Sequence, residues 1–149
     1  MMQRGRRIAF DYGDVRIGVA ASDPDSILSS PLTTLKTSDK NLLNQIVELI
    51  KEIEPVQIFV GNPALLSGKD GAASEKAFLF AEQLREITDV EILMVDERMS
   101  TISAARNLRE SGKNAKDAKE SIDMAAAVGI LEFGISLQKS RSWFKWEGC

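Results

Sequence analysis

The stretch RIAFDYGDVRIGVAA, residues 7–21, decides the fold. Its two apolar runs, at 7–10 and 16–21, flank a short turn at Gly13-Asp14, which predicts a pair of antiparallel strands. Because side chains alternate along a strand, Asp11 shares a face with Ala9 and lies opposite the face of the neighbouring apolar residues. A carboxylate at the end of a buried strand is either an acceptor for turn amides or a functional group.

Seven more elements follow from the spacing of apolar residues and from capping signals. They are a strand at 31–36, a helix at 41–54 capped by Asp39 and stopped by Pro55, a strand at 56–61, a helix at 74–88, a strand at 91–95, a short helix that begins with Ser100 or Thr101 as its cap and ends at Gly112, and a helix at 121–138. The charged segment 113–120 is expected to be a mobile loop. A hairpin followed by strands and helices in alternation predicts a mixed five-stranded α/β sheet flanked by helices.

The composition limits the chemistry that the chain can perform. It has 149 residues, a net charge of −3, no histidine and a single cysteine, Cys149. Imidazole metal ligands, triad hydrolysis and a zinc site built on thiolates are therefore excluded. No apolar run is long enough to span a membrane and no signal peptide is evident, so a cytoplasmic location is expected.

We divide the chain into a domain at 1–138 and a tail at 139–149. The tail alternates cations with aromatic rings: Lys139, Arg141 and Lys145 with Trp143, Phe144 and Trp146. Such a stretch can bind nucleic acid by stacking and charge, or it can pack back on the domain.

Three acids are candidates for a common site. Asp123 shares a helical stripe with Ala126, Ala127, Ile130 and Gly134, so it faces the packed side of its helix. Asp96 and Glu97 follow a buried strand, where open α/β sheets build their sites. If these acids meet Asp11, only a hard cation, Mg²⁺ or Mn²⁺, would hold them together, and a phosphodiester is the natural substrate. Each acid also has a local alternative: a turn acceptor, a partner of the helix dipole for Asp123, or an ion pair of Glu97 with Arg98.

Four motifs occur in order: DYGDVRIGVA at 11–20, VGNPALLSG at 60–68, VDERMST at 95–101 and IDMAAAVGIL at 122–131. Together they resemble the YqgF family of bacterial proteins over about residues 6–135. The resemblance implies a ribonuclease-H-like fold and an activity described as Holliday-junction-resolvase-like or as maturation of pre-16S rRNA.

The same resemblance assigns roles to individual residues. It implies that Asp11, Glu97 and Asp123 are the catalytic and metal-binding acids, and that the substrate lies near five more residues: Arg16, Arg98, Ser100, Thr101 and Lys119.

Two positions depart from the family pattern. Ser121 stands where many members have a basic residue, and Gly61-Asn62 stands where related enzymes often carry an acid. The second acid must then come from the next strand, as Asp96 or Glu97, and the motif favours Glu97.

The sequence therefore predicts a metal-dependent nuclease that matures the 5′ end of pre-16S rRNA. Its partners would be nucleic acid and ribosomal particles, with no membrane, and it would act as a monomer or a homodimer. A Holliday junction resolvase and a non-catalytic ribosome-assembly or nucleic-acid-binding module are the alternatives. A kinase of the actin type is disfavoured, because its phosphate hairpin usually has Ser or Thr where this chain has Asp14, and because 149 residues do not supply its second domain.

Overall fold

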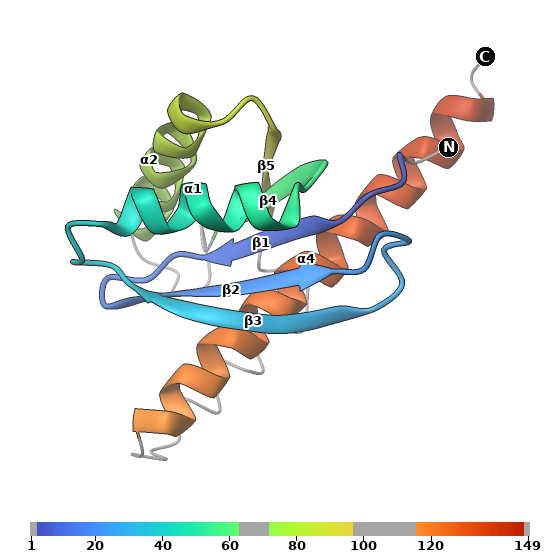
Figure 1. Ribbon diagram of the computed structural model, residues 1–149. Helices are drawn as coiled ribbons and strands as arrows, with labels where there is room; N and C mark the ends of the chain where they lie inside the picture. The colour runs from blue at the N-terminus through green and yellow to red at the C-terminus, as the bar shows by residue number, and fades with distance from the viewer. Residues whose placement is uncertain (1–2, 63–71, 97–115, 148–149) are drawn as a thin grey trace.

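A mixed five-stranded sheet forms the centre of the computed structural model (Figure 1). The structure describes residues 3–62, 72–96 and 116–147, with the backbone alone at 72–73, 116–123 and 141–147. The strands are β1 (Arg7–Asp11), β2 (Arg16–Ser22), β3 (Ser29–Lys36), β4 (Gln57–Asn62) and β5 (Glu91–Asp96). Their order in the sheet is β3-β2-β1-β4-β5.

The strand directions confirm the predicted fold. β1 and β2 form the antiparallel hairpin, β2 pairs antiparallel with β3, and β4 and β5 run parallel to β1. The parallel pairs require crossovers, which the helices supply. Helices α1 (Leu42–Ile53) and α2 (Ala72–Ile87) cover one face, and α4 (Lys116–Glu147) crosses the other (Figure 1).

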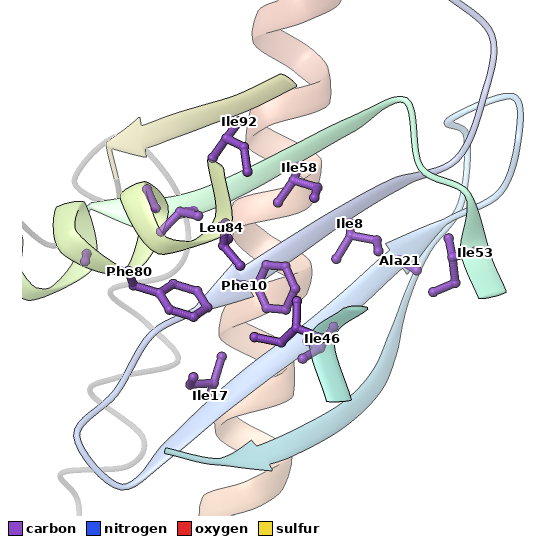
Figure 2. Packing of buried hydrophobic residues seen from close by; sticks show 14 residues of the cluster. Ile8, Phe10, Ile17, Ala21, Ile46, Ile53, Ile58, Phe80, Leu84 and Ile92 are labelled. Carbon is purple, nitrogen blue, oxygen red and sulfur yellow. The ribbon is translucent and has the colours of Figure 1, made fainter. Parts of the chain in front are cut away.

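The face under α1 and α2 carries the larger hydrophobic core (Figure 2). Alternate residues of β1 and β2, including Phe10 and Ile17, meet Ile46 of α1 and Phe80 of α2 there. The rings of Phe10 and Phe80 lie edge to face with centroids 5.6 Å apart, a favoured geometry for aromatic pairs. This core holds the hairpin rigidly against both helices.

The face under α4 is built from small side chains. Ala9 and Ala20 of the hairpin pack with Ala126 and Ala127 of the helix, and all four are fully buried. Gly134 lies so close to the sheet that a Cβ atom there would stand 2.8–2.9 Å from ring atoms of Phe59. The small-residue stripe predicted for the last helix is thus confirmed as a sheet-packing face.

The bounds of this helix were predicted wrongly. It begins at Lys116, not 121, and runs to Glu147, beyond the predicted end at 138. Residues 116–120 were expected to be a mobile loop because they are charged, yet Ala, Lys and Glu are strong helix formers. No Gly or Pro stands between Gly134 and Gly148, so nothing in the sequence stops the helix at 138.

The other helices differ less from expectation. Asp39 does not cap α1; the N-cap is Asn41, and the Asp39 carboxylate accepts a 2.8 Å hydrogen bond from the Asn41 N–H just before the helix. The short helix predicted after Ser100 lies outside the described residues. In the described parts of the chain, no helix has the length and apolarity to cross a membrane.

Substitution of Gly134 by Ala tests the close approach of α4 to the sheet. Alanine favours a helix over glycine by about 1 kcal/mol, but its Cβ would overlap the buried Phe59 ring. Overpacking costs about 1–3 kcal/mol, so we expect the free energy of unfolding in urea to fall. Ser136→Ala, at an exposed position of the same helix, should cause no loss. A Gly134→Ala protein more stable than wild type would contradict the close approach.

Candidate active site around Asp11

Asp11 is a buried carboxylate at the carboxyl end of the central strand. Only 4% of the residue is exposed, and its alternation with Ala9 places it on the face that α4 covers. Its register partner on β2 is Gly18, and Gly61 follows the β4 residue that pairs with Phe10. Glycine on both neighbouring strands adds no side chain beside the carboxylate. The side chains next to Asp11 on its own face of the sheet are therefore limited to those of β1 and of α4.

Asp96 lies on the opposite face of the sheet from Asp11. Along β5, Ile92 and Met94 pack into the core under α1 and α2, whereas Leu93 and Val95 pack with the α4 cluster. Alternation therefore directs Asp96 toward the α1 and α2 side. This geometry counts against Asp96 as the partner of Asp11, so Glu97 stays the predicted second acid.

The other predicted site residues are only partly placed. Arg16 begins β2, half-buried, two residues before Gly18 and so on the same face as Asp11. Asp123 and Lys119 lie on α4, where the backbone alone is described. Glu97, Arg98, Ser100 and Thr101 lie outside the described residues. Among the described residues no cluster of three acidic or thiol side chains forms a metal site, and the convergence of the three acids stays a prediction.

The turn that joins Asp11 to Arg16 is held from two sides. Thr37, just after β3, donates a 2.7 Å hydrogen bond from its hydroxyl to the Gly13 carbonyl and a 3.0 Å bond from its N–H to the Val15 carbonyl. A Cβ on Gly13 would stand 2.6 Å from the Arg16 carbonyl oxygen, so this turn needs glycine. The chain that carries both site residues is therefore positioned by an element more than twenty residues away.

Helix α2 holds the same turn from its other side. The Lys76 ammonium donates a 3.0 Å hydrogen bond to the Asp14 carboxylate at the turn, and this bond raises the pKa of Lys76. Tyr12 packs on Phe80 of the same helix with ring centroids 5.0 Å apart. The roles of Thr37 and Lys76 were not predicted, because nothing in the local sequence pattern signals a contact between distant segments.

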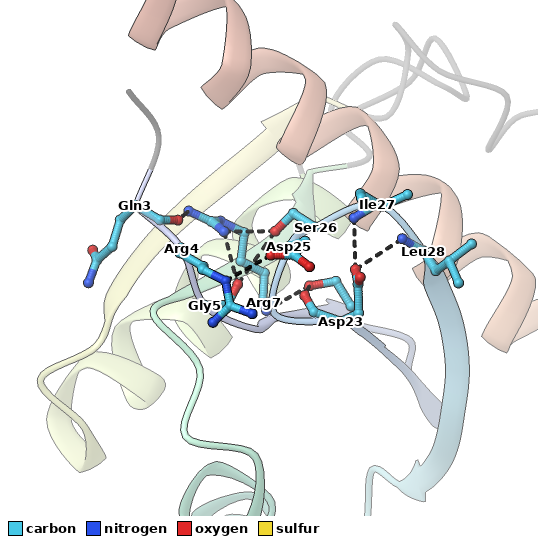
Figure 3. Close-up of polar contacts among 10 residues, drawn as sticks. Gln3, Arg4, Gly5, Arg7, Asp23, Asp25, Ser26, Ile27 and Leu28 are labelled. Atoms are coloured by element: carbon cyan, nitrogen blue, oxygen red, sulfur yellow. Dashed lines mark hydrogen bonds and ion pairs between the residues drawn. The ribbon is translucent and has the colours of Figure 1, made fainter.

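A second cluster of buried polar groups occupies the opposite end of the sheet (Figure 3). Arg7, at the start of β1, is 1% exposed, and burial lowers its pKa. Its guanidinium donates to Gln57, to the Ser26 hydroxyl at 2.8 Å and to two backbone carbonyls, of Gln3 and Gly5. These bonds tie the N-terminal segment and the β2–β3 loop to β4. They form a structural network, separate from the edge that carries Asp11.

Residues 5–135 match the model of a protein family described as RuvX, Holliday junction resolvase. This span includes every strand of the sheet and most of α4. The chain belongs to the RuvX family. The resemblance noted from the four sequence motifs, which also covered about residues 6–135, is confirmed.

Sequence identity to two bacterial proteins supports this membership over most of the length of both. A protein of Nocardia farcinica is 47% identical over 137 residues, which cover 87% of this chain and 76% of the relative. A protein of Streptomyces avermitilis is 41% identical and is covered to 90%. Both carry the provisional name pre-16S rRNA nuclease.

Solved structures confirm the fold of this RuvX family member. Thermus thermophilus RuvC, solved in complex with a Holliday junction substrate, matches with a TM-score of 0.52 at 13% identity, over 85% of this chain and 90% of that one. A further structure of RuvC from the same organism matches with a TM-score of 0.50. At this identity the likeness bears on the fold, which is the ribonuclease-H-like class predicted from the sequence.

Substitution of Thr37 tests how the turn is positioned. Thr37→Val keeps the side-chain shape but leaves the Gly13 carbonyl without its donor, so we expect a loss of about 1 kcal/mol in the free energy of unfolding. Amide exchange at 12–16 should also accelerate. Thr37→Ser, which retains the hydroxyl, should restore both values.

The matched control is Thr33→Val on β3, the strand that Thr37 follows. The Thr33 hydroxyl donates only a local 3.3 Å bond to the next carbonyl, away from the turn. Equal losses in the Thr33 and Thr37 variants would show that the bond to Gly13 has no special role.

Proposed function

We propose that the protein is a metal-dependent nuclease that hydrolyses phosphodiester bonds of pre-16S rRNA near its 5′ end. The observation that carries the proposal is the buried Asp11 at the carboxyl end of the central strand, in a chain of the RuvX family. The names of the relatives supply the RNA substrate. A carboxylate at this end of the sheet supplies the hard oxygen ligand that a divalent cation takes in proteins.

The donor set fits a hard divalent cation, Mg²⁺ or Mn²⁺. Asp11 supplies carboxylate oxygens, the chain has no histidine, and glycine flanks Asp11 on β2. We propose Glu97 and Asp123 as the remaining ligands. Such a cation, when bound, lowers the pKa of water and neutralises charge on a phosphoryl group in transfer.

The chain's own groups would position the substrate. Asp11 ends a strand that is hydrogen-bonded on both sides and leads into a fixed turn, so its position is set before the substrate arrives. Arg16, on the same face, would donate to a phosphate oxygen of the bound strand. Arg98, Ser100, Thr101 and Lys119 are proposed to extend this contact, and α4 excludes water from the covered side of Asp11.

A four-way DNA junction is the second candidate substrate. It is favoured by the description of the family model. RNA and DNA present the same phosphodiester, and proteins distinguish them through the 2′-hydroxyl.

The proposed RNA substrate suggests where the enzyme acts and with which partners. We propose that the enzyme acts in the cytoplasm on ribosomal particles, as a monomer or a homodimer. The nuclease domain would span 1–138. Residues 139–147 continue α4 at the end of the sheet that carries the Arg7 network, where Lys139 donates to the Ser26 carbonyl, away from Asp11.

A cleavage assay tests the function directly. Purified protein with Mn²⁺ is offered a pre-16S rRNA fragment and a four-way DNA junction side by side. We expect the RNA to be cut and Asp11→Asn to lose on the order of 10⁴-fold in rate, as when a catalytic residue of a hydrolase is removed. Cleavage of the junction alone would assign the second substrate, and activity retained in Asp11→Asn would refute the site.

Melting curves separate a metal ligand from a turn acceptor at Asp11. Without metal, the amide of Asp11→Asn removes one charge from a group of acids, so the melting temperature should hold or rise. With Mn²⁺ the order should reverse, because wild type gains stability from binding and the variant lacks a ligand. A mere turn acceptor would give the same drop with and without Mn²⁺.

The two acids that end β5 provide a paired test. Asp96 lies on the face away from Asp11, so Asp96→Asn should keep cleavage within a few-fold of wild type. Glu97→Gln should lose activity as fully as Asp11→Asn. The reverse result, with Asp96 essential, would overturn the assignment of Glu97.

A further inference from the structure

Two cationic side chains, Arg16 and Lys36, lie opposite each other at the same end of the sheet as Asp11. Arg16, the first residue of β2, is the register partner of Lys36, the last residue of β3. The Thr37 N–H bonds to the Val15 carbonyl at 3.0 Å, one position further along the pair. Arg16 and Lys36 are therefore a non-hydrogen-bonded pair, in which opposite side chains come closest, with Cα atoms about 4.5 Å apart.

Both cations lie on the same face of the sheet as Asp11. Arg16 is two residues before Gly18, the register partner of Asp11, and Lys36 is two residues after Thr34, the partner of Gly18. The residues between them, Ile17 and Leu35, point into the opposite core. Side-chain alternation thus directs the acid and the two cations to one side, with glycine between them on β2.

This pairing places two like charges directly opposite each other. Like charges directly opposite each other on an antiparallel pair are destabilising. Lys36 is exposed, and within the described residues its ammonium has no acidic partner. A bound anion that neutralises the charges would relieve the repulsion.

We propose that Lys36 binds a backbone phosphate of the nucleic acid, next to Arg16 and beside the cleavage site. The inference rests on the proposed nuclease function and adds a substrate contact to it. Strands lie about 4.8 Å apart, so Lys36 stands about 10 Å across the sheet from β1. Lys36 also lies two residues, about 7 Å, beyond the position in register with Asp11, so the two Cα atoms are roughly 12 Å apart. At a rise of about 3.4 Å per nucleotide, this corresponds to a phosphate about three to four nucleotides from the bond held at Asp11.

Binding in EDTA tests the contact without cleavage. Labelled pre-16S rRNA fragment and DNA junction are titrated with wild type, Lys36→Gln and Lys51→Gln over a range of salt. Lys51 is the matched control, because it loses the same charge but lies on α1, over the opposite face. Loss of one phosphate contact should make the plot of log affinity against log salt shallower by about 0.7–0.9 and weaken binding about five- to tenfold at 0.1 M.

We expect this change in Lys36→Gln on both probes and not in Lys51→Gln. The melting temperature of free Lys36→Gln should equal or exceed that of wild type, because the repulsion with Arg16 is removed. Wild-type affinity and salt slope in Lys36→Gln would overturn the contact, as would equal losses in both variants or a lower melting temperature.

The cleavage assay and the binding titration distinguish a failure of the proposed nuclease function from a failure of the Lys36 contact. A wild-type protein that cuts neither substrate with Mn²⁺ overturns the function, while a salt-slope effect confined to Lys36→Gln would still support the phosphate contact. A wild-type protein that cuts, with Lys36→Gln binding like wild type, overturns only the contact.

Discussion

The close approach of α4 to the sheet is the constraint on which the rest of the structure depends. Ala9 and Ala20 on the strands and Gly134 on the helix leave no room for larger side chains, and Phe59 fills the space against the glycine. This contact determines which face of β1 is buried under the helix. It therefore determines that Asp11 is enclosed on the α4 side, where the family's third acid is expected, while the opposite face is committed to hydrophobic core.

One end of the sheet carries a structural hydrogen-bond network, and the other end carries the candidate active site. At the amino ends of β1 and β4, the Arg7 guanidinium donates hydrogen bonds to neutral acceptors such as Gln57 and Ser26. These bonds satisfy the buried cation, so Arg7 has a structural role and is not part of a ligand site. At the carboxyl end of β1, a buried acid, a fixed turn and two facing cations gather at one edge. That edge is where open α/β sheets place their ligands, because the strand ends and the loops after them converge there.

Sequence patterns predicted the elements whose signals are local. The hairpin followed from two apolar runs around Gly13, and the end of α1 followed from Pro55, before which Glu54 adopts a left-handed conformation. The prediction was wrong for residues 116–120, which were expected to form a loop because they are charged. They are helical, because their helix propensity outweighs their polarity. The convergence of Glu97 and Asp123 with Asp11 rests on family resemblance and is still a prediction.

The sequence by itself determined the order of strands and helices, the face on which Asp11 lies and the family, because all three depend on residues close together in the chain or on linear motifs. Only the tertiary structure decided that Thr37 holds the turn, that Asp96 points away from Asp11 and that Lys36 stands opposite Arg16. These facts depend on strand register and on packing between segments twenty or more residues apart. Register is set by the burial of whole faces, which no local pattern records.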